Sequence, residues 1–427
     1  MSEYAFKSAV ALASAIAAKE ISSLELTDMY IDRVESLDPD INAVVVKDFE
    51  RGREEARAAD SAVAAGKALG PLHGVPMTIK EAYDIKGLPT TWGFPEFEHN
   101  IATTDSEMVV RMKRAGAHFF GKTNVPRSLA DFQSFNDIYG TTNNPWDLER
   151  TPGGSSGGSA AALAAGLTGL EAGSDIGGSI RNPAHFCGIY GHKPTWGVVS
   201  DAGHALPGQV APADIAVVGP MARSAEDLKI SMDLSAGASS HDVAGWQLNL
   251  PKPSKTHLKD FRVAIWTNDD MAPVSQEISD RVQSIGDMLS RLGATVSDSA
   301  RPEIDIEESH DTYNSLLWGV MAAELSAEEK SEYHARLGQL DPNDRSIAAN
   351  MIRYSVQSHG NWAENNNKRF LIRQRWQRFF NDWDIVICPQ TATTAFPQDE
   401  GGYLERKIIV DNVEQDYFQQ VFWSGLV

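Results

Sequence analysis

Two glycine-dense turns carry the hydroxyl groups that could do nucleophilic chemistry in this chain. The first has the sequence Thr151-Pro-Gly-Gly-Ser-Ser-Gly-Gly-Ser159 and the second Gly173-Ser-Asp-Ile-Gly-Gly-Ser179. Glycine permits positive φ angles and lets backbone N–H groups approach a ligand closely. Successive inward-turned amides can hold a developing oxyanion, so Ser179 could lie beside its own oxyanion hole. From the glycines alone, a pair of flexible loops or a phosphate cradle remains an alternative.

A serine nucleophile needs a base, and an upstream lysine is the candidate. The apolar stretch Gly74-Val-Pro-Met-Thr-Ile-Lys80 predicts a strand that ends on Lys80. Burial there would disfavour the ammonium form, and the pKa could fall from about 10.4 by several units, which would make a neutral amine available. A snorkelling or salt-bridged lysine is the alternative. His185 and His192 lie near the second turn, but structural or surface roles suit both imidazoles better.

Two other motifs match by letter but not by context. Gly153-Gly-Ser-Ser-Gly157 fits the nucleophile elbow of α/β-hydrolases, which must follow an apolar strand. Asp147-Leu-Glu-Arg-Thr-Pro152 precedes it instead. The stretch 116–123 matches the P-loop pattern, yet its interior predicts a strand and a helical segment precedes it. We therefore favour neither the elbow nor nucleotide binding.

The positions of these motifs require strands and helices that alternate along the chain. The first 70 residues predict helices, with Ser22 and Glu25 as a capping box. Further on, the expected strands are 44–46, 76–79, 117–120, 261–266, 294–296 and 384–388, and the expected helices are 51–65, 106–115, 159–167 and 275–292. This alternation predicts an α/β fold with a mixed or mainly parallel sheet.

No linker rich in proline, glycine or serine divides the chain, so we expect a single domain over 1–427. Its parts would be a helical N-terminal region (1–70), a core that carries the motifs (about 71–230) and an acidic, aromatic helical insertion (about 301–380). The apolar ending Gln-Gln-Val-Phe-Trp-Ser-Gly-Leu-Val predicts either a helix docked into the core or a shortened chain.

Composition narrows the classes of partner. The 427 residues carry a formal net charge of −20, which argues against nucleic acid and anionic lipid, because phosphate binding needs clustered Lys and Arg. No basic region precedes the first apolar stretch, so we predict an amphipathic helix and not a secretory signal. Two cysteines, Cys187 and Cys388, suggest no disulfide framework, which fits a cytoplasmic enzyme. The chain could form a homodimer.

Taken together, these motifs closely resemble the amidase signature family. The shared stretches are GVPMTIK (74–80), GKTNVP (121–126), NNPW (143–146), TPGGSSGGSAAALAAG (151–166), GSDIGGSIRNPAHFCGIYGHKPTWGVVS (173–200), GPMARSAEDL (219–228) and DWDIVICPQTATTAFP (382–397). The resemblance covers most of residues 1–400. It implies a large mixed, mainly parallel β-sheet flanked by helices on both faces, and no metal or organic cofactor.

The resemblance also implies a catalytic relay. Ser179 would be the nucleophile, Lys80 the general base, and Ser155, preceded by a cis peptide bond, the bridge between them. Ser156 and Arg181 would support the loops. The oxyanion would be held by the amides of Ile176, Gly177, Gly178 and Ser179, and the substrate would lie near Leu129, Ala130 and Asp131.

Several classes of substrate fit these motifs. We expect a small-molecule aryl or alkyl amide, with esters and carbamates as related substrates. Trp318, Trp362 and Trp376 could line an apolar pocket, although aromatic residues at helical spacing more often belong to a core. The alternatives are the amide-transferring subunit of a tRNA-dependent amidotransferase, and a binding module that has lost its chemistry.

Overall fold

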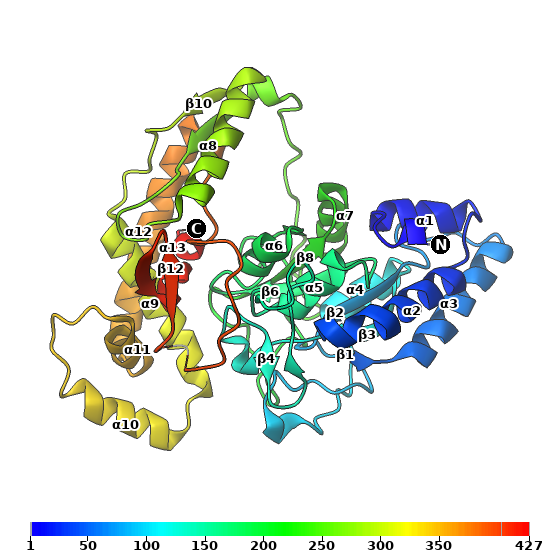
Figure 1. Ribbon diagram of the computed structural model, residues 1–427, viewed down its shortest axis with the longest axis horizontal. Helices are drawn as coiled ribbons and strands as arrows, with labels where there is room; N and C mark the ends of the chain where they lie inside the picture. The colour runs from blue at the N-terminus through cyan, green and yellow to red at the C-terminus, as the bar shows by residue number, and fades with distance from the viewer. Residues whose placement is uncertain (1, 403, 427) are drawn as a thin grey trace. The chain divides into compact units, whose positions relative to one another are not determined.

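The computed structural model describes residues 2–402 and 404–426. The chain forms two compact units (Figure 1). Unit 1 comprises Met1–Pro212, Ala216–Asn249 and Ala395–Gln398, and unit 2 comprises Ala213–Ile215, Leu250–Thr394 and Asp399–Val427. Unit 1 contains every residue of the predicted catalytic relay. The single domain expected from the sequence stays a prediction.

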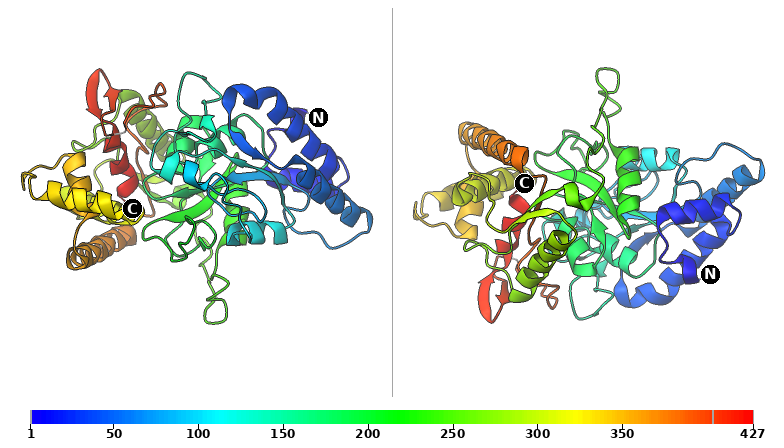
Figure 2. Two further views of the ribbon diagram at one scale, coloured as in Figure 1. Left: turned by 90° about the horizontal axis from the view of Figure 1, so that it is seen from below. Right: turned by 90° about the horizontal axis from the view of Figure 1, so that it is seen from above.

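The helices of unit 1 begin and end near the predicted positions. They are α1 (Ala9–Ala17), α2 (Ser23–Ile41), α3 (Phe49–Ala64), α4 (Glu107–Arg114), α5 (Gly157–Ala164), α6 (Arg181–Cys187) and α7 (Ala225–Ser235), with 3-10 turns η1 (Ser2–Tyr4), η2 (Pro95–Phe97) and η3 (Arg127–Leu129). The capping box of α2 is present, because Ser22 Oγ accepts from the Glu25 amide at 3.0 Å and Glu25 Oε2 accepts from the Ser22 amide at 2.9 Å. Helices α2 and α3 lie side by side in Figures 1 and 2.

The strands of unit 1 form small sheets with parallel and antiparallel pairs. They are β1 (Val44–Lys47), β2 (Pro76–Lys80), β3 (His118–Thr123), β4 (Phe135–Asn136), β5 (Gly140–Thr141), β6 (Glu171–Asp175), β7 (Tyr190–Gly191) and β8 (Val217–Ala222). β3 pairs in parallel with β2 and antiparallel with β1, while β8 pairs antiparallel with both β6 and β7. The stretch that resembles a P-loop therefore contains β3, as its sequence predicts.

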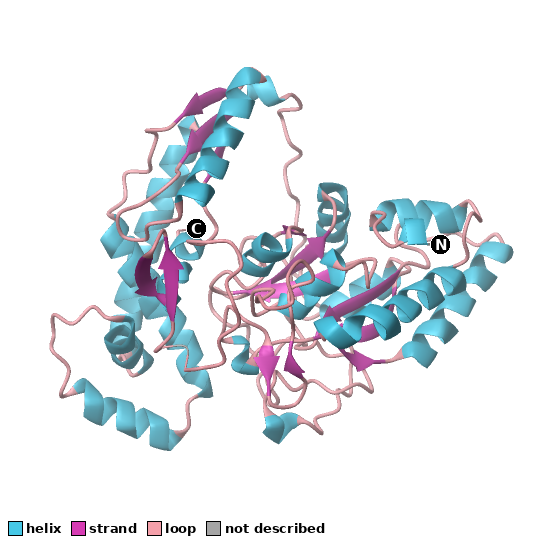
Figure 3. Cartoon of the chain, in the orientation of Figure 1, coloured by secondary structure: helices cyan, strands magenta, loops and turns pink. Residues whose placement is uncertain are grey.

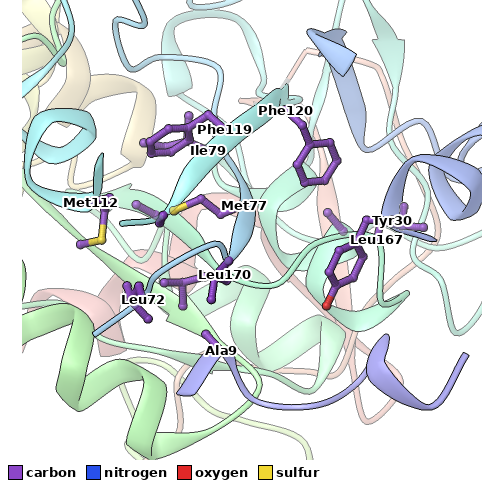
Figure 4. Close-up of a cluster of buried hydrophobic side chains, with 14 of the residues drawn as sticks. Ala9, Tyr30, Leu72, Met77, Ile79, Met112, Phe119, Phe120, Leu167 and Leu170 are labelled. Atoms are coloured by element: carbon purple, nitrogen blue, oxygen red, sulfur yellow. The ribbon is translucent and has the colours of Figure 1, made fainter. Parts of the chain in front are cut away.

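A large apolar core holds β2 in place. Figure 4 shows Met77 and Ile79 from β2 within the same cluster as Phe119 and Phe120 from β3 and Tyr30 from α2. Successive side chains of a strand point to opposite faces. The core contacts of positions 77 and 79 therefore direct positions 78 and 80 to the other face, which is also buried. This alternation fixes the direction in which Lys80 points.

Unit 2 is mainly helical (Figure 3). Its elements are η4 (Leu258–Asp260), β9 (Arg262–Ile265), α8 (Gln276–Arg291), β10 (Thr295–Ser297), α9 (Ile306–Met321), η5 (Ala322–Glu324), α10 (Ala327–Leu337), α11 (Ile347–Ser355), α12 (His359–Asp382), β11 (Ile385–Ile387), β12 (Lys407–Val410), β13 (Val413–Asp416), η6 (Tyr417–Gln420) and α13 (Val421–Gly425). β9 pairs in parallel with β10 and β11, and β12 and β13 form a hairpin.

The three tryptophans considered as pocket residues from the sequence lie in different surroundings in unit 2. Trp318 is buried and stacks on Phe418, with ring centroids 5.2 Å apart. Trp376 is buried in a separate cluster that also contains Phe422 and Trp423 of α13. Both indoles pack as core residues, whereas Trp362 is half-buried. Among the described residues, no helix combines the length and the apolar character needed to cross a membrane.

Candidate active site

Lys80 ends β2 with its side chain fully buried. Its Nζ donates to Ser155 Oγ at 2.6 Å and to Ser174 Oγ at 2.9 Å. Burial penalises the ammonium form and lowers the pKa of Lys80 to about 7, although the nearby Asp175 carboxylate acts in the opposite direction. An amine with such a pKa is neutral in a substantial fraction of molecules at neutral pH, so it can accept a proton.

The first glycine-dense turn brings Ser155 to this lysine. The peptide bond between Gly154 and Ser155 is cis, as the family resemblance implies. A Cβ added to Gly154 would lie 2.4 Å from the carbonyl oxygen of Asp131, and one added to Gly158 would lie 2.3 Å from the amide nitrogen of Asn124. No side chain fits at either position. The glycines therefore let this turn and the first residues of α5 pack tightly against neighbouring backbone.

The second glycine-dense turn is organised around Asp175, the last residue of β6. Its carboxylate accepts from the amides of Gly178 (2.9 Å), Ile180 (3.0 Å) and Arg181 (3.2 Å). The Arg181 guanidinium adds contacts of 2.8 and 3.0 Å. Burial alone would raise the pKa of Asp175, but the Arg181 charge and the hydrogen bonds bring it well below its usual range. A permanently ionised carboxylate thus fixes the backbone on both sides of Ser179.

Ser156 joins the two turns. Its amide donates to the carbonyl oxygen of Ser179 at 3.1 Å. Its hydroxyl donates to the Ser174 carbonyl oxygen and accepts from the Ser174 amide, both at 3.3 Å. The candidate nucleophile and the candidate bridging serine are therefore held in one hydrogen-bonded unit. The hydroxyl of Ser179 has no hydrogen-bond partner among the described residues, and the side chain is buried apart from a small exposed fraction.

Three of the four predicted oxyanion amides, those of Gly177, Gly178 and Ser179, differ in their hydrogen bonds. The Gly178 N–H, which the sequence assigned to the oxyanion, already donates to Asp175. By contrast, the amides of Gly177 and Ser179 have no acceptor within the described part of the chain. On this turn the N–H groups of Gly177 and Ser179 are therefore available to a ligand, whereas that of Gly178 is not. Because Asp175 accepts from the Gly178 amide, it helps to shape the turn.

The sequence-predicted substrate residues lie in one segment beside the first turn. Leu129 and Ala130 are half-buried, and the Asp131 carbonyl oxygen packs against Gly154. Ser174 and Asp175 were not assigned roles from the sequence, although both belong to the second motif. The role of Asp175 could have been predicted from the sequence, since an Asp three residues before a glycine amide can cap a turn. The contact of Ser174 with Lys80 could not, because it depends on how β6 faces β2.

Comparison with known proteins gives the class of the fold first. The structure is similar to a solved fatty acid amide hydrolase, with a TM-score of 0.81 and 25% identity over 99% of this chain and 72% of that one. This likeness confirms the predicted amidase signature α/β fold. The sequence model of the family described as Amidase matches residues 25–423. The chain belongs to the amidase signature family, whose members hydrolyse carbon–nitrogen amide bonds.

Curated relatives fall into two functional groups. One is an acylamidase from Rhodococcus erythropolis, 33% identical over 395 residues, which cover 91% of this chain and 80% of the relative. Another is a subunit of the glutamyl-tRNA(Gln) amidotransferase from Acidothermus cellulolyticus, 32% identical over 429 residues, 94% of this chain and 83% of that protein. These relatives share one family but differ in the reaction that their names give.

Proposed function

We propose that this protein is an amidase that hydrolyses small aryl or alkyl carboxamides through a serine acyl-enzyme. The observation that carries the proposal is the buried Lys80, whose pKa of about 7 accompanies a 2.6 Å hydrogen bond to Ser155. In the proposed mechanism, neutral Lys80 accepts a proton from Ser155 as Ser155 accepts one from Ser179. The Ser179 oxygen then attacks the carbonyl carbon of the substrate.

The remaining steps use the same groups. The amides of Gly177 and Ser179 would donate to the oxyanion of the tetrahedral intermediate. The proton returns through Ser155 to the leaving amine, the C–N bond breaks, and the acyl group stays on Ser179. A water molecule, deprotonated through the same relay, hydrolyses that ester and releases the carboxylic acid. Esters and carbamates with adequate leaving groups could follow the same route.

The amidase proposal is tested by incubating the full chain alone with a panel of aryl and alkyl amides and measuring released amine. We expect turnover by the unmodified protein and its loss in Ser179→Ala. Ser299→Ala, in an exposed loop of unit 2, is the matched control and should keep the parent rate. A panel in which no amide is hydrolysed, with folding verified by circular dichroism, would overturn the proposal.

A second candidate is the amide-transferring subunit of a tRNA-dependent amidotransferase. It is supported by the 32% identity to a subunit of a glutamyl-tRNA(Gln) amidotransferase. Such a subunit would act within a larger assembly, and the net charge of −20 leaves tRNA binding to a partner. Hydrolysis of free amides at several turnovers per second without any added subunit would favour the amidase, since enzymes commonly turn over at about 10 s⁻¹.

A further inference from the structure

We propose that Trp92 is a specificity-determining residue of this site and that its ring receives a planar aromatic group of the substrate. The inference rests on the proposed amide hydrolysis. Trp92 follows β2 on a loop that is tied to the residue next to the base. The Glu81 carboxylate accepts from the amide of Thr91 at 2.7 Å and from that of Trp92 at 3.0 Å.

A second connection links Trp92 to the turn that carries Ser155. The carbonyl oxygen of Trp92 accepts from the Ser128 amide at 2.9 Å. Three residues further on, the Asp131 carbonyl oxygen packs against Gly154 so closely that a Cβ there would lie only 2.4 Å away. The segment 128–131 therefore connects Trp92 to the residue before Ser155. Separate contacts thus link the Trp92 backbone to the sequence neighbours of both Lys80 and Ser155.

The Trp92 indole ring is fixed by two contacts and remains partly exposed. Its Nε1 donates to the Ala82 carbonyl oxygen at 3.2 Å, and its centroid lies 5.1 Å from that of His204. The Tyr83 ring packs edge-on against His204 at 4.7 Å. The Trp92 side chain nevertheless remains half-buried. A fixed, partly exposed aromatic surface is suited to receive another flat apolar group, because aromatic rings favour stacked or edge-to-face contact.

An unpartnered nitrogen of His204 is a second, independent observation that points to a ligand beside this ring. Its Nε2 is buried and has no hydrogen-bond partner among the described residues. Burial and the nearby Lys80 ammonium lower the pKa of His204 to about 3, so the imidazole is neutral. Buried polar atoms in folded proteins nearly always have partners. A substrate seated against Trp92 could supply one here through a polar atom next to its aromatic group.

Buried charged side chains hold the loop that precedes Trp92. The Lys122 ammonium donates to the Pro89 carbonyl oxygen and, at 3.0 Å, to Thr90 Oγ1. Lys122 and Glu81 are both fully buried and interact electrostatically. Trp92 itself has φ of 54°, in the left-handed region that bulky residues rarely adopt. Such a conformation persists where the surroundings determine it, and it often marks a functional site.

The test uses two matched substrate pairs. Phenylacetamide against propionamide places the aromatic group on the acyl side, and acetanilide against N-propylacetamide places it on the amine side. In Trp92→Leu, which keeps apolar volume without an aromatic face, we expect kcat/KM for the aryl member of one pair to fall about tenfold, mainly through KM. The alkyl member should change by less than about twofold. Trp92→Phe should recover most of the aryl activity.

The controls separate this inference from the proposed function. Trp246→Ala removes an exposed indole of unit 1 and should leave both ratios unchanged. If the parent protein hydrolyses amides but Trp92→Leu keeps the parent aryl-to-alkyl ratio in both pairs, the role of Trp92 is refuted and the amidase proposal survives. If the parent hydrolyses none of the four compounds, the amidase proposal itself fails. Thermal unfolding of each variant verifies that it is folded.

Discussion

The Nζ of Lys80 lies 2.6 Å from the Oγ of Ser155, although 75 residues of sequence separate them. The first residue ends a buried strand and the second follows a cis peptide bond in a glycine-dense turn. The Lys80 Nζ also donates to Ser174 Oγ of β6 at 2.9 Å, and this second hydrogen bond orients the amine. This arrangement positions one amine between two hydroxyl groups in a buried site, where a neutral lysine can act as a base.

Replacement of Lys80 by arginine should abolish most of the amidase activity. The guanidinium keeps the positive charge but is not deprotonated in proteins, so it cannot accept the proton. We expect kcat to fall by about 10²–10⁴-fold, the usual contribution of a general base. Lys229→Arg, at a lysine with 75% of its side chain exposed, is the matched control and should be unaffected. Parent-like activity in folded Lys80→Arg would show that Lys80 is not the base.

The pH dependence of the parent enzyme should report the Lys80 titration. The base must be neutral, so kcat/KM should rise with pH, reach half its maximum near the Lys80 pKa of about 7, and then level off. One pH unit below that midpoint, activity should be about tenfold lower than the plateau. The profile is measured with a neutral amide so that the substrate does not titrate. A rate that is flat between pH 5.5 and 8.5 (roughly the window around this midpoint) would argue against this base.

Replacement of Asp175 by asparagine should move that profile towards lower pH. The Asp175 carboxylate raises the pKa of Lys80, so removal of its charge should lower that pKa further and keep the amine neutral in more acidic solution. The maximal rate should fall, because Asp175 also holds the backbone around Ser179. Loss of a buried ion-pair partner typically costs about 3–5 kcal/mol of stability. Chemical denaturation measures that cost. A midpoint of the kcat/KM profile that moves to higher pH in Asp175→Asn would contradict the assignment of Lys80 as the titrating base.

Addition of one methyl group at Gly154 should disable the site. In Gly154→Ala the new Cβ would lie 2.4 Å from the Asp131 carbonyl oxygen and 2.5 Å from that of Gln133, so the turn before Ser155 must shift. A displacement of about 1 Å can cost about 100-fold in rate. Gly245→Ala is the control, because its Cβ would have its nearest neighbour at 3.5 Å. Equal amidase rates for both variants would show that the packing of this turn is unimportant.

Much of this site was predictable because its residues belong to contiguous motifs. The strand pattern of 74–80 ends on the lysine that the structure buries, and the glycines mark turns where backbone segments meet closely. The role of Ser174 was not predictable, because its contact with Lys80 depends on which face β6 turns towards β2. The use of the Gly178 amide by Asp175 also needed coordinates, since neighbouring amides in a glycine turn look equivalent in sequence.

Aromatic residues were the least predictable part. Trp318 and Trp376 lie on helices where the spacing is the same for a core contact as for a pocket wall, and the structure packs both into the core. Trp92 lies in a loop without periodicity. Its position depends on two hydrogen bonds of its backbone, because its amide donates to Glu81 and its carbonyl oxygen accepts from the Ser128 amide, and only the folded chain reveals them.

The identity of the nucleophile is the central claim, and covalent labelling tests it most directly. The parent protein is treated with a sulfonyl fluoride, and the modified peptide is mapped by mass spectrometry. The proposed relay predicts a single label on Ser179 that is lost in folded Lys80→Ala. A label on Ser155 or on any other serine, with Ser179 unmodified, would contradict it.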